Sequence, residues 1–155
     1  MNIFVLDINP ILSAQYLCDK HVNKAGIIEP CQLLHAALFR VGYKDDRNPY
    51  NPNGRFAKWA ATSRVNFEWL VSFSLASVEE FKFRFGKSHQ TEERIISLSK
   101  NINLIPDGVL TTFVRSETVS KDIVDTVDAY RNYYMTGKRD LCKWEKGRES
   151  PVWWS

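Results

Sequence analysis

Apolar residues recur at helical spacing along a long stretch of the chain, between Phe56 and Phe85. Apart from the adjacent Trp59 and Ala60, successive members of this pattern are three to five residues apart, so one face of a helix would be largely apolar. The positions on this face are Phe56, Trp59, Ala60, Val65, Trp69, Phe73, Ala76, Glu80 and Phe83. The pattern predicts one long amphipathic helix over residues 56–85, and with it a mostly α fold.

Further helices are predicted on both sides of this stretch. A helical pattern extends from Ile11 to about Arg40, and Asn9-Pro10 supplies a helix start. Pro30 lacks a backbone donor, so we expect a kink near residues 28–29. Two more helices are expected over 92–99 and over 120–135, the second with Ser120 as its N-cap.

The remaining segments are predicted to be loops or extended chain. The apolar run at residues 2–6 (NIFVL) is typical of a short N-terminal strand or a buried extended segment. Residues 42–54 are rich in Gly, Pro and Asn, and residues 101–108 also contain turn-forming residues. We therefore expect one small helical domain over residues 1–155.

Composition excludes several classes of protein. The 155 residues are 44% hydrophobic and 25% charged, which is ordinary for a globular domain and disfavours intrinsic disorder. Three cysteines without tight pairing argue against a secreted disulfide scaffold. No signal peptide or membrane span is recognisable, so we expect a cytoplasmic protein without a membrane partner. The net charge of +3 is compatible with nucleic-acid binding without being diagnostic of it.

The helix expected over residues 19–35 carries the side chains best suited to chemistry. Residues three and four apart share a face of a helix. The predicted stripe consists of His21, Lys24, Ile28, Cys31 and His35, with Asp19, Lys20 and Glu29 at its edges. These residues could also have no chemical role. His21 and Lys24 could be solvated or paired with nearby acids, and Cys31 could be a small buried apolar residue.

Three kinds of chemistry are open to this stripe. Metal binding by Asp19, His21, Cys31 and His35 would lack a compact ligand motif, so no metal or cofactor is expected. A nucleophilic Cys31–His35 pair has a suitable spacing but no further support. The third is imine formation by an amine beside a carboxylate.

The start and the end of the chain resemble the pyrimidine-dimer DNA glycosylase (endonuclease V) family. The resemblance rests on a carboxylate followed by an apolar helical run, Glu29-Pro30-Cys31-Gln32-Leu33-Leu34-His35, and on the tail Pro151-Val152-Trp153-Trp154. The chain is also similar to a group of uncharacterised phage proteins that share three motifs. These are LCDKHV (17–22), RFGKSH (84–89) and AYRNYY (129–134). A phage-encoded protein of the bacterial cytoplasm is therefore expected.

The glycosylase resemblance implies a base-excision enzyme in which an amine attacks C1′ of a flipped nucleotide. Glu29 would be the catalytic carboxylate. The amine would be the α-amine of Met1 or the side-chain amine of Lys24. Because Asn2 is a large residue, we expect Met1 not to be removed. His21 and His35 would be auxiliary acids or phosphate contacts, Asp19 is a further candidate catalytic residue, and no cofactor is implied.

Contacts with DNA would come from basic and aromatic residues. The residues expected to bind nucleic acid are Lys82, Arg84, Lys87, His35, Lys143, Lys146, Arg148, Trp153 and Trp154. Three rival functions remain open at this point. One is a non-catalytic protein that binds a nucleotide, a nucleic acid or a host factor, and the second is an enzyme on free nucleotides with a pocket at Asp19, His21 and Glu29. The third is a metal-dependent nuclease.

Overall fold

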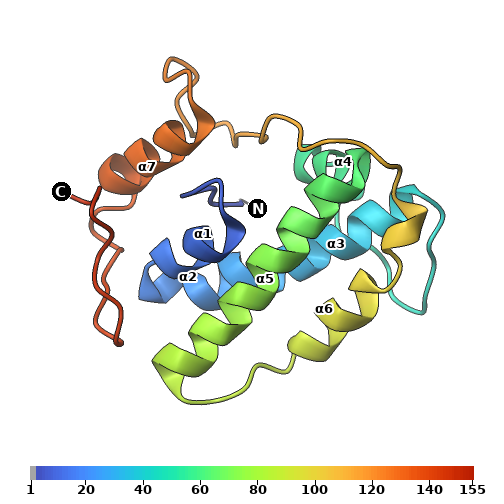
Figure 1. Ribbon diagram of the computed structural model, residues 1–155, viewed down its shortest axis with the longest axis horizontal. Coiled ribbons are helices and arrows are strands. Elements are labelled where there is room, and N and C mark those ends of the chain that lie inside the picture. Colours follow the sequence, from blue (N-terminus) through green and yellow to red (C-terminus); the bar gives the residue numbers. More distant parts are fainter. Residues whose placement is uncertain (1–2) are drawn as a thin grey trace.

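Helix α5 (Arg64–Phe85) crosses the middle of the molecule, and the other helices are arranged around it (Figure 1). The structure is a computed structural model that describes residues 3–155. All regular elements among these residues are helical, which confirms the mostly α fold. No helix in this part of the chain is both long enough and apolar enough to cross a bilayer.

The N-terminal part of the chain is an extended segment followed by short helices. Residues 3–6 are buried and extended, and Asn9 caps α1 (Pro10–Tyr16) with its side-chain oxygen, as expected. Helix α2 (Asp19–Asn23) continues through a π turn, η1 (Lys24–Ile28), into α3 (Glu29–Arg40). The distortion expected ahead of Pro30 is therefore a π turn, in which the Glu29 N–H donates to the Lys24 carbonyl.

The single helix expected over residues 56–85 is wrong in one respect. The structure has α4 (Arg55–Thr62) and α5, separated by an extended Ser63 with φ −150° and ψ 154°. The Ser63 hydroxyl caps α5 by accepting from the Asn66 N–H at 3.1 Å, and it donates to the Val109 carbonyl at 2.8 Å. The Asn66 N–H and the Val109 carbonyl both bind this hydroxyl when Ser63 is extended. The bend at Ser63 therefore replaces a continuous helix.

The later helices differ in how well their bounds were predicted. Helix α6 (Glu92–Ser99) has the predicted bounds, and a short 3₁₀ turn, η2 (Ile102–Leu104), follows it. Helix α7 (Thr126–Gly137) begins later than expected, with Asp125 as its N-cap. The prediction that Ser120 caps this helix is wrong, because the Arg115 guanidinium binds the carbonyls of Ser120, Ile123 and Val124 and holds that segment as a loop.

Close contact between two helices fixes the position of the early helices on α5. A Cβ atom added at Gly26, in the π turn, would lie 2.7 Å from Ser77 Oγ and 2.8 Å from Ser77 Cβ. Only glycine allows this approach.

On the other side, the chain after α7 descends beside α2 and returns toward α7 (Figure 1), so the C-terminal segment covers the beginning of α2.

Candidate functional site

The π turn decides which side chains of the early helices share a face. Eight positions separate His21 from Glu29. In a regular α-helix these side chains would lie about 80° apart around the axis. A π turn takes up one extra residue, which reduces the offset to about 20°. His21 and Glu29 therefore lie on one side of the α2–η1–α3 run, about two turns apart.

The same extra residue divides the stripe predicted from the sequence. With the extra residue included, the side chains of Cys31 and His35 lie on the side of the helical run opposite to His21. There they line a pocket together with Ile28, which belongs to the same stripe. The single stripe from His21 to His35 is thus wrong, and the early helices present two separate sites.

His21 is held between the N-terminal segment and α7. Its ring stacks on Phe4 with centroids 4.8 Å apart and an interplanar angle of 14°. Its Nδ1 lies 2.7 Å from the hydroxyl of Tyr134, a fully buried residue of α7. These two contacts fix the imidazole ring in one orientation.

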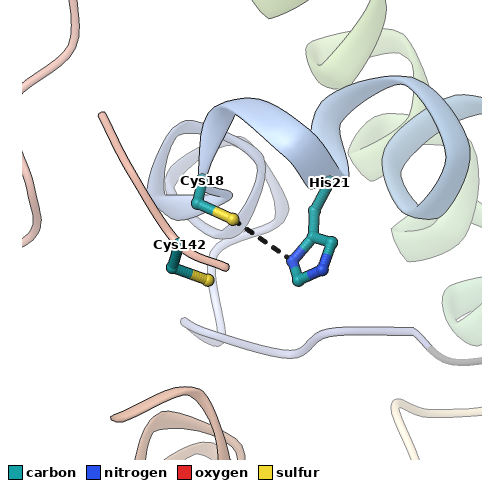
Figure 2. Close-up of side chains that lie close together, drawn as sticks. All are labelled: Cys18, His21 and Cys142. Carbon is teal, nitrogen blue, oxygen red and sulfur yellow. Dashed lines mark hydrogen bonds between the residues drawn. The ribbon is translucent and has the colours of Figure 1, made fainter. Parts of the chain in front are cut away.

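Two cysteines complete the surroundings of His21 (Figure 2). Cys18 precedes α2, and its Sγ lies 3.4 Å from His21 Nδ1. Cys142 comes from the chain after α7, and its sulfur points toward the same space. One donor atom from each of Cys18, His21 and Cys142 lies within 4.8 Å of the others, and both cysteines are buried. We call these residues the Cys–His cluster.

The environment of the cluster favours one thiolate. A hydrogen bond with Cys142 lowers the pKa of the Cys18 thiol, and the neighbouring His21 lowers it further against the opposing effect of burial. The pKa of Cys142 is raised by the same hydrogen bond and by burial. Of the two thiols, Cys18 is therefore the one that loses its proton first.

An ion-pair network holds the C-terminal segment on α2. The Asp19 N–H donates to the Lys143 carbonyl at 2.9 Å, and Asp19 Oδ2 accepts from the Glu145 N–H at 2.7 Å. Asp19 Oδ1 lies 3.2 Å from Nη1 of Arg84, whose side chain is 0% exposed. Asp19 is thus engaged in positioning the segment that carries Cys142.

Two residues expected to contact phosphate are part of this network. Arg84 also donates to the carbonyls of Gln15 and Leu17, so its guanidinium is enclosed by protein groups. Arg148 donates to both carboxylate oxygens of the buried Glu80, at 2.9 and 3.1 Å. The assignment of Arg84 to DNA binding is wrong because the side chain does not reach the surface, and Arg148 is bound to Glu80.

Glu29, the predicted catalytic carboxylate, is half-buried at the first position of α3. One turn further along α3, Leu33 lines a cavity of 420 Å³. Arg55, from the first position of α4, lines the same cavity, together with polar side chains from residues 116–118. We call this space the Leu33 cavity. It combines the Arg55 guanidinium, the Glu117 carboxylate that pairs with it at 3.2 Å, and two hydroxyl groups.

The second site is a pocket of 510 Å³ on the opposite side, which we call the His35 pocket. It is lined by Cys31, Gln32, His35, Arg47, Tyr50 and Arg94, among others. Asp45 borders it, with Oδ1 3.2 Å from His35 Nε2 and Oδ2 2.7 Å from Arg94 Nη1. Burial lowers the pKa of His35, so the neutral ring is favoured there.

Burial raises the pKa of the Cys31 thiol to about 11. A thiol with so high a pKa carries little thiolate near neutral pH, and the thiolate is the nucleophilic form. The environment of Cys31 therefore disfavours the Cys31–His35 nucleophile, although both residues line the His35 pocket.

The other predicted site residues lie at the surface or in packed positions. Lys24, Lys87, Lys143 and Lys146 are exposed, and Lys82 pairs with Glu79 and Glu92. The rings of Trp153 and Trp154 pack on Tyr134, and Arg131 and Arg139 lie over them. They fasten the tail to α7 and are only half-exposed. Met1 lies outside the described residues.

Sequence reasoning missed the partners that make these sites. Cys18 and Cys142 are far apart in the sequence, and only the bend of the chain after α7 unites them. Tyr134 lies within the AYRNYY motif, yet its contact with His21 could not be read from spacing. No protein-family model, curated protein or solved structure matches the chain.

Proposed function

We propose that the protein is a DNA base-excision enzyme, an N-glycosylase with abasic-site lyase activity, in which Glu29 is the catalytic carboxylate. The observation that carries the proposal is the π turn. It turns Glu29 to the face of His21 and Leu33, and Leu33, one turn further along α3, lines the cavity in which a sugar would be bound. In a regular helix with the same sequence, Glu29 would lie about 80° around the axis from His21.

The Leu33 cavity is suited to an extruded nucleotide. Its 420 Å³ falls in the range of about 300–1,000 Å³ usual for small-ligand pockets. Arg55 would offer a cation to a flanking phosphate. Its guanidinium donates to the Arg115 carbonyl at 3.0 Å and pairs with Glu117 at 3.2 Å, so a phosphate would replace the exposed Glu117 carboxylate. The hydroxyl groups of Ser116 and Thr118 supply donors and acceptors for a base edge.

The reaction follows from an amine beside a carboxylate. The amine nitrogen forms a bond to C1′ while the glycosidic bond breaks, and the base departs with the bonding electrons and takes up a proton. Glu29 stabilises the positive charge that develops on the sugar. Proton loss from the nitrogen and opening of the sugar ring give an imine. Removal of a proton from C2′ then expels the 3′ phosphate, and water hydrolyses the imine.

Two amines are available for the attack. The α-amine of Met1 has a reference pKa of about 8 and is partly neutral near neutral pH. The described N-terminal segment supports this choice, because Phe4 stacks directly on His21. Lys24 is the alternative, and it lies within the π turn at the surface. His21 acts as a positioning residue, with Nδ1 turned toward Tyr134 and Cys18.

Borohydride trapping tests this proposal. The reagent reduces an imine to a stable amine, so an imine-forming enzyme becomes covalently attached to its DNA. The protein is incubated with duplexes that contain an abasic site, a uracil or a pyrimidine dimer, with an undamaged duplex as control. We expect a covalent complex with a damaged duplex, and peptide mapping then identifies Met1 or Lys24. The absence of any complex on all damaged duplexes contradicts the proposal.

The His35 pocket favours a second function, binding of a phosphate-bearing small molecule such as a free nucleotide. Arg47 and Arg94 bring two guanidinium groups against the single carboxylate of Asp45. Nη2 of Arg94 is buried and has no hydrogen-bond partner within residues 3–155. Buried polar atoms of this kind are usually satisfied, so a bound anion would complete the pocket.

Calorimetric titration with deoxynucleoside monophosphates distinguishes the two functions. Binding that is lost in Arg47→Ala and unchanged in Arg55→Ala assigns the ligand to the His35 pocket. Binding that depends on Arg55 instead assigns it to the Leu33 cavity. If neither variant changes the binding, both assignments are wrong.

A further inference from the structure

The Cys–His cluster is composed of the donor atoms that zinc prefers. Two thiol sulfurs and an imidazole nitrogen converge from separate parts of the chain (Figure 2). Cys18 is 0% and Cys142 is 6% exposed, so the two sulfurs are withdrawn from solvent. Cysteine and histidine side chains are the usual ligands of tetrahedral zinc.

One edge of the cluster has the length expected at a zinc site, and the Cys142 sulfur lies within 4.8 Å of both other donor atoms. Zinc–sulfur bonds of about 2.3 Å and zinc–nitrogen bonds of about 2.0–2.1 Å imply a sulfur–nitrogen edge of about 3.5 Å in a tetrahedron. Cys18 Sγ and His21 Nδ1 are 3.4 Å apart. We propose that Cys18, His21 and Cys142 bind a zinc ion.

The hydroxyl of Tyr134 lies beside the cluster. This oxygen is 2.7 Å from His21 Nδ1 and 3.6 Å from Cys18 Sγ, and it also accepts from the Cys18 N–H at 3.2 Å. Three protein ligands leave the fourth position of a zinc tetrahedron to a further ligand, such as a water molecule hydrogen-bonded to the Tyr134 hydroxyl. Tyr134 is fully buried, so such a water would be held within the protein.

Zinc binding would change the ionisation of the cluster. Zinc binds the thiolate form of cysteine, so both thiols would lose their protons on metal binding. A disulfide between the two cysteines would use the sulfurs but would leave the imidazole contact unexplained.

A zinc ion here would attach the C-terminal segment to the start of α2. That segment contains no regular secondary structure after α7, and Asp19 already binds it through Lys143 and Glu145. The metal would also fix the His21 ring on the face shared with Glu29. It would therefore be a structural element next to the proposed catalytic face, independent of which substrate is bound there.

Metal analysis of tag-free protein tests the site. The chain is purified from zinc-supplemented medium, dialysed, and its zinc content is measured by mass spectrometry. We expect one zinc per chain in the wild type and in the control variant Cys31→Ser, whose cysteine lies on the opposite face. Cys18→Ser and Cys142→Ser should lose it. Tyr134→Phe should retain zinc with an affinity about 10–100-fold lower, because it removes a hydrogen-bond partner of the groups that would bind the metal.

A second measurement needs no variant and therefore does not depend on variant folding. Cobalt added to metal-free wild-type protein should give the thiolate charge-transfer and visible bands of a tetrahedral site, and zinc should displace it. A wild type that holds neither metal, or whose intact mass is lower by the two hydrogens of a Cys18–Cys142 disulfide, overturns the proposal. Zinc retained in both cysteine variants also overturns it. None of these readouts requires DNA activity, so the base-excision proposal can fail separately.

Discussion

The carboxylate of Glu80 and the guanidinium of Arg84 form an ion pair inside the protein, one turn apart on α5. Arg84 Nε lies 3.1 Å from Glu80 Oε2, and the two side chains are 0% and 3% exposed. Glu80 also binds Arg148, so one carboxylate joins α5 to the C-terminal segment. Buried charges of this kind are tolerated only while their partners are present.

Removing the Glu80 charge should therefore strongly destabilise the fold. Glu80→Gln removes one of the two carboxylates that face the enclosed Arg84 guanidinium and also the carboxylate that binds Arg148, and we expect a loss of about 3–5 kcal/mol in the free energy of unfolding. The control is Glu68→Gln, an exposed position on the same helix, which should leave the unfolding midpoint almost unchanged. Denaturant unfolding followed by circular dichroism measures both. Equal stability of the two variants would show that the network contributes little.

The contact between Gly26 and Ser77 should be equally specific. Gly26→Ala places a Cβ within 2.8 Å of Ser77 Cβ, and overpacking of this kind typically costs about 1–3 kcal/mol. Ser77→Gly removes the opposing atoms, so the double variant should recover part of that loss. A double-mutant cycle of unfolding free energies measures the coupling. Additive effects would mean that the helices do not meet as closely as described.

The neutral state of His35 predicts how stability depends on pH. Burial lowers the folded-state pKa of His35 below its reference value of 6.5, so below that pH the unfolded chain binds more protons than the folded protein. The stability contributed by neutral His35 is complete above about pH 6.5 and is lost as the pH falls toward the folded-state pKa. Burial shifts His89 in the same direction.

Unfolding free energies measured between about pH 7.5 and 5 test this dependence. Wild-type stability should fall over that range, and His35→Gln should show a shallower decline. Asp45 does not interfere there. Although burial opposes the shift, its bonds to Arg47 and Arg94 lower its pKa to about 2, so its contribution is lost only at more acidic pH. Parallel curves for wild type and variant would mean that His35 is not held neutral.

The sequence predicted the elements whose signals are local. The Asn9-Pro10 start of α1 and the bounds of α6 were correct because capping and apolar spacing act over a few residues. The break at Ser63 was missed because its hydroxyl is satisfied by Val109, far along the chain. The late start of α7 was missed because Arg115 organises the preceding loop from outside it.

The candidate site was less predictable for the same reason. Glu29 and His21 were singled out by residue type, but regular helix geometry placed them wrongly relative to Cys31 and His35. A π turn depends on tertiary contacts such as the Gly26–Ser77 approach and is not marked by any spacing rule. Arg84 looked like a surface cation beside Lys82 and Lys87, and only the fold shows that it is enclosed.

The structure reduces the number of basic residues that the proposed DNA footprint can include. Arg84 is buried and Arg148 is bound to Glu80, which leaves the exposed Lys143 and Lys146 in the C-terminal segment. If the proposed function is right, the double variant Lys143→Ala/Lys146→Ala should reduce the slope of log affinity against log salt by about two. Fluorescence anisotropy at several salt concentrations measures the slope. Lys100→Ala, at the distant C-terminal end of α6, is the control, and an unchanged slope in the double variant would remove this segment from the footprint.

The rate of strand cleavage by Glu29→Gln tests the central claim most directly. Single-turnover cleavage of an abasic-site duplex is measured for wild type, Glu29→Gln and the exposed control Glu68→Gln, together with their melting temperatures. Loss of an electrostatic contact of this kind costs about 3 kcal/mol in the barrier, so Glu29→Gln should be slower by about a hundredfold or more and remain folded. The control should keep the wild-type rate. A folded Glu29→Gln protein that cleaves at the full rate would contradict the assignment of Glu29 as the catalytic carboxylate.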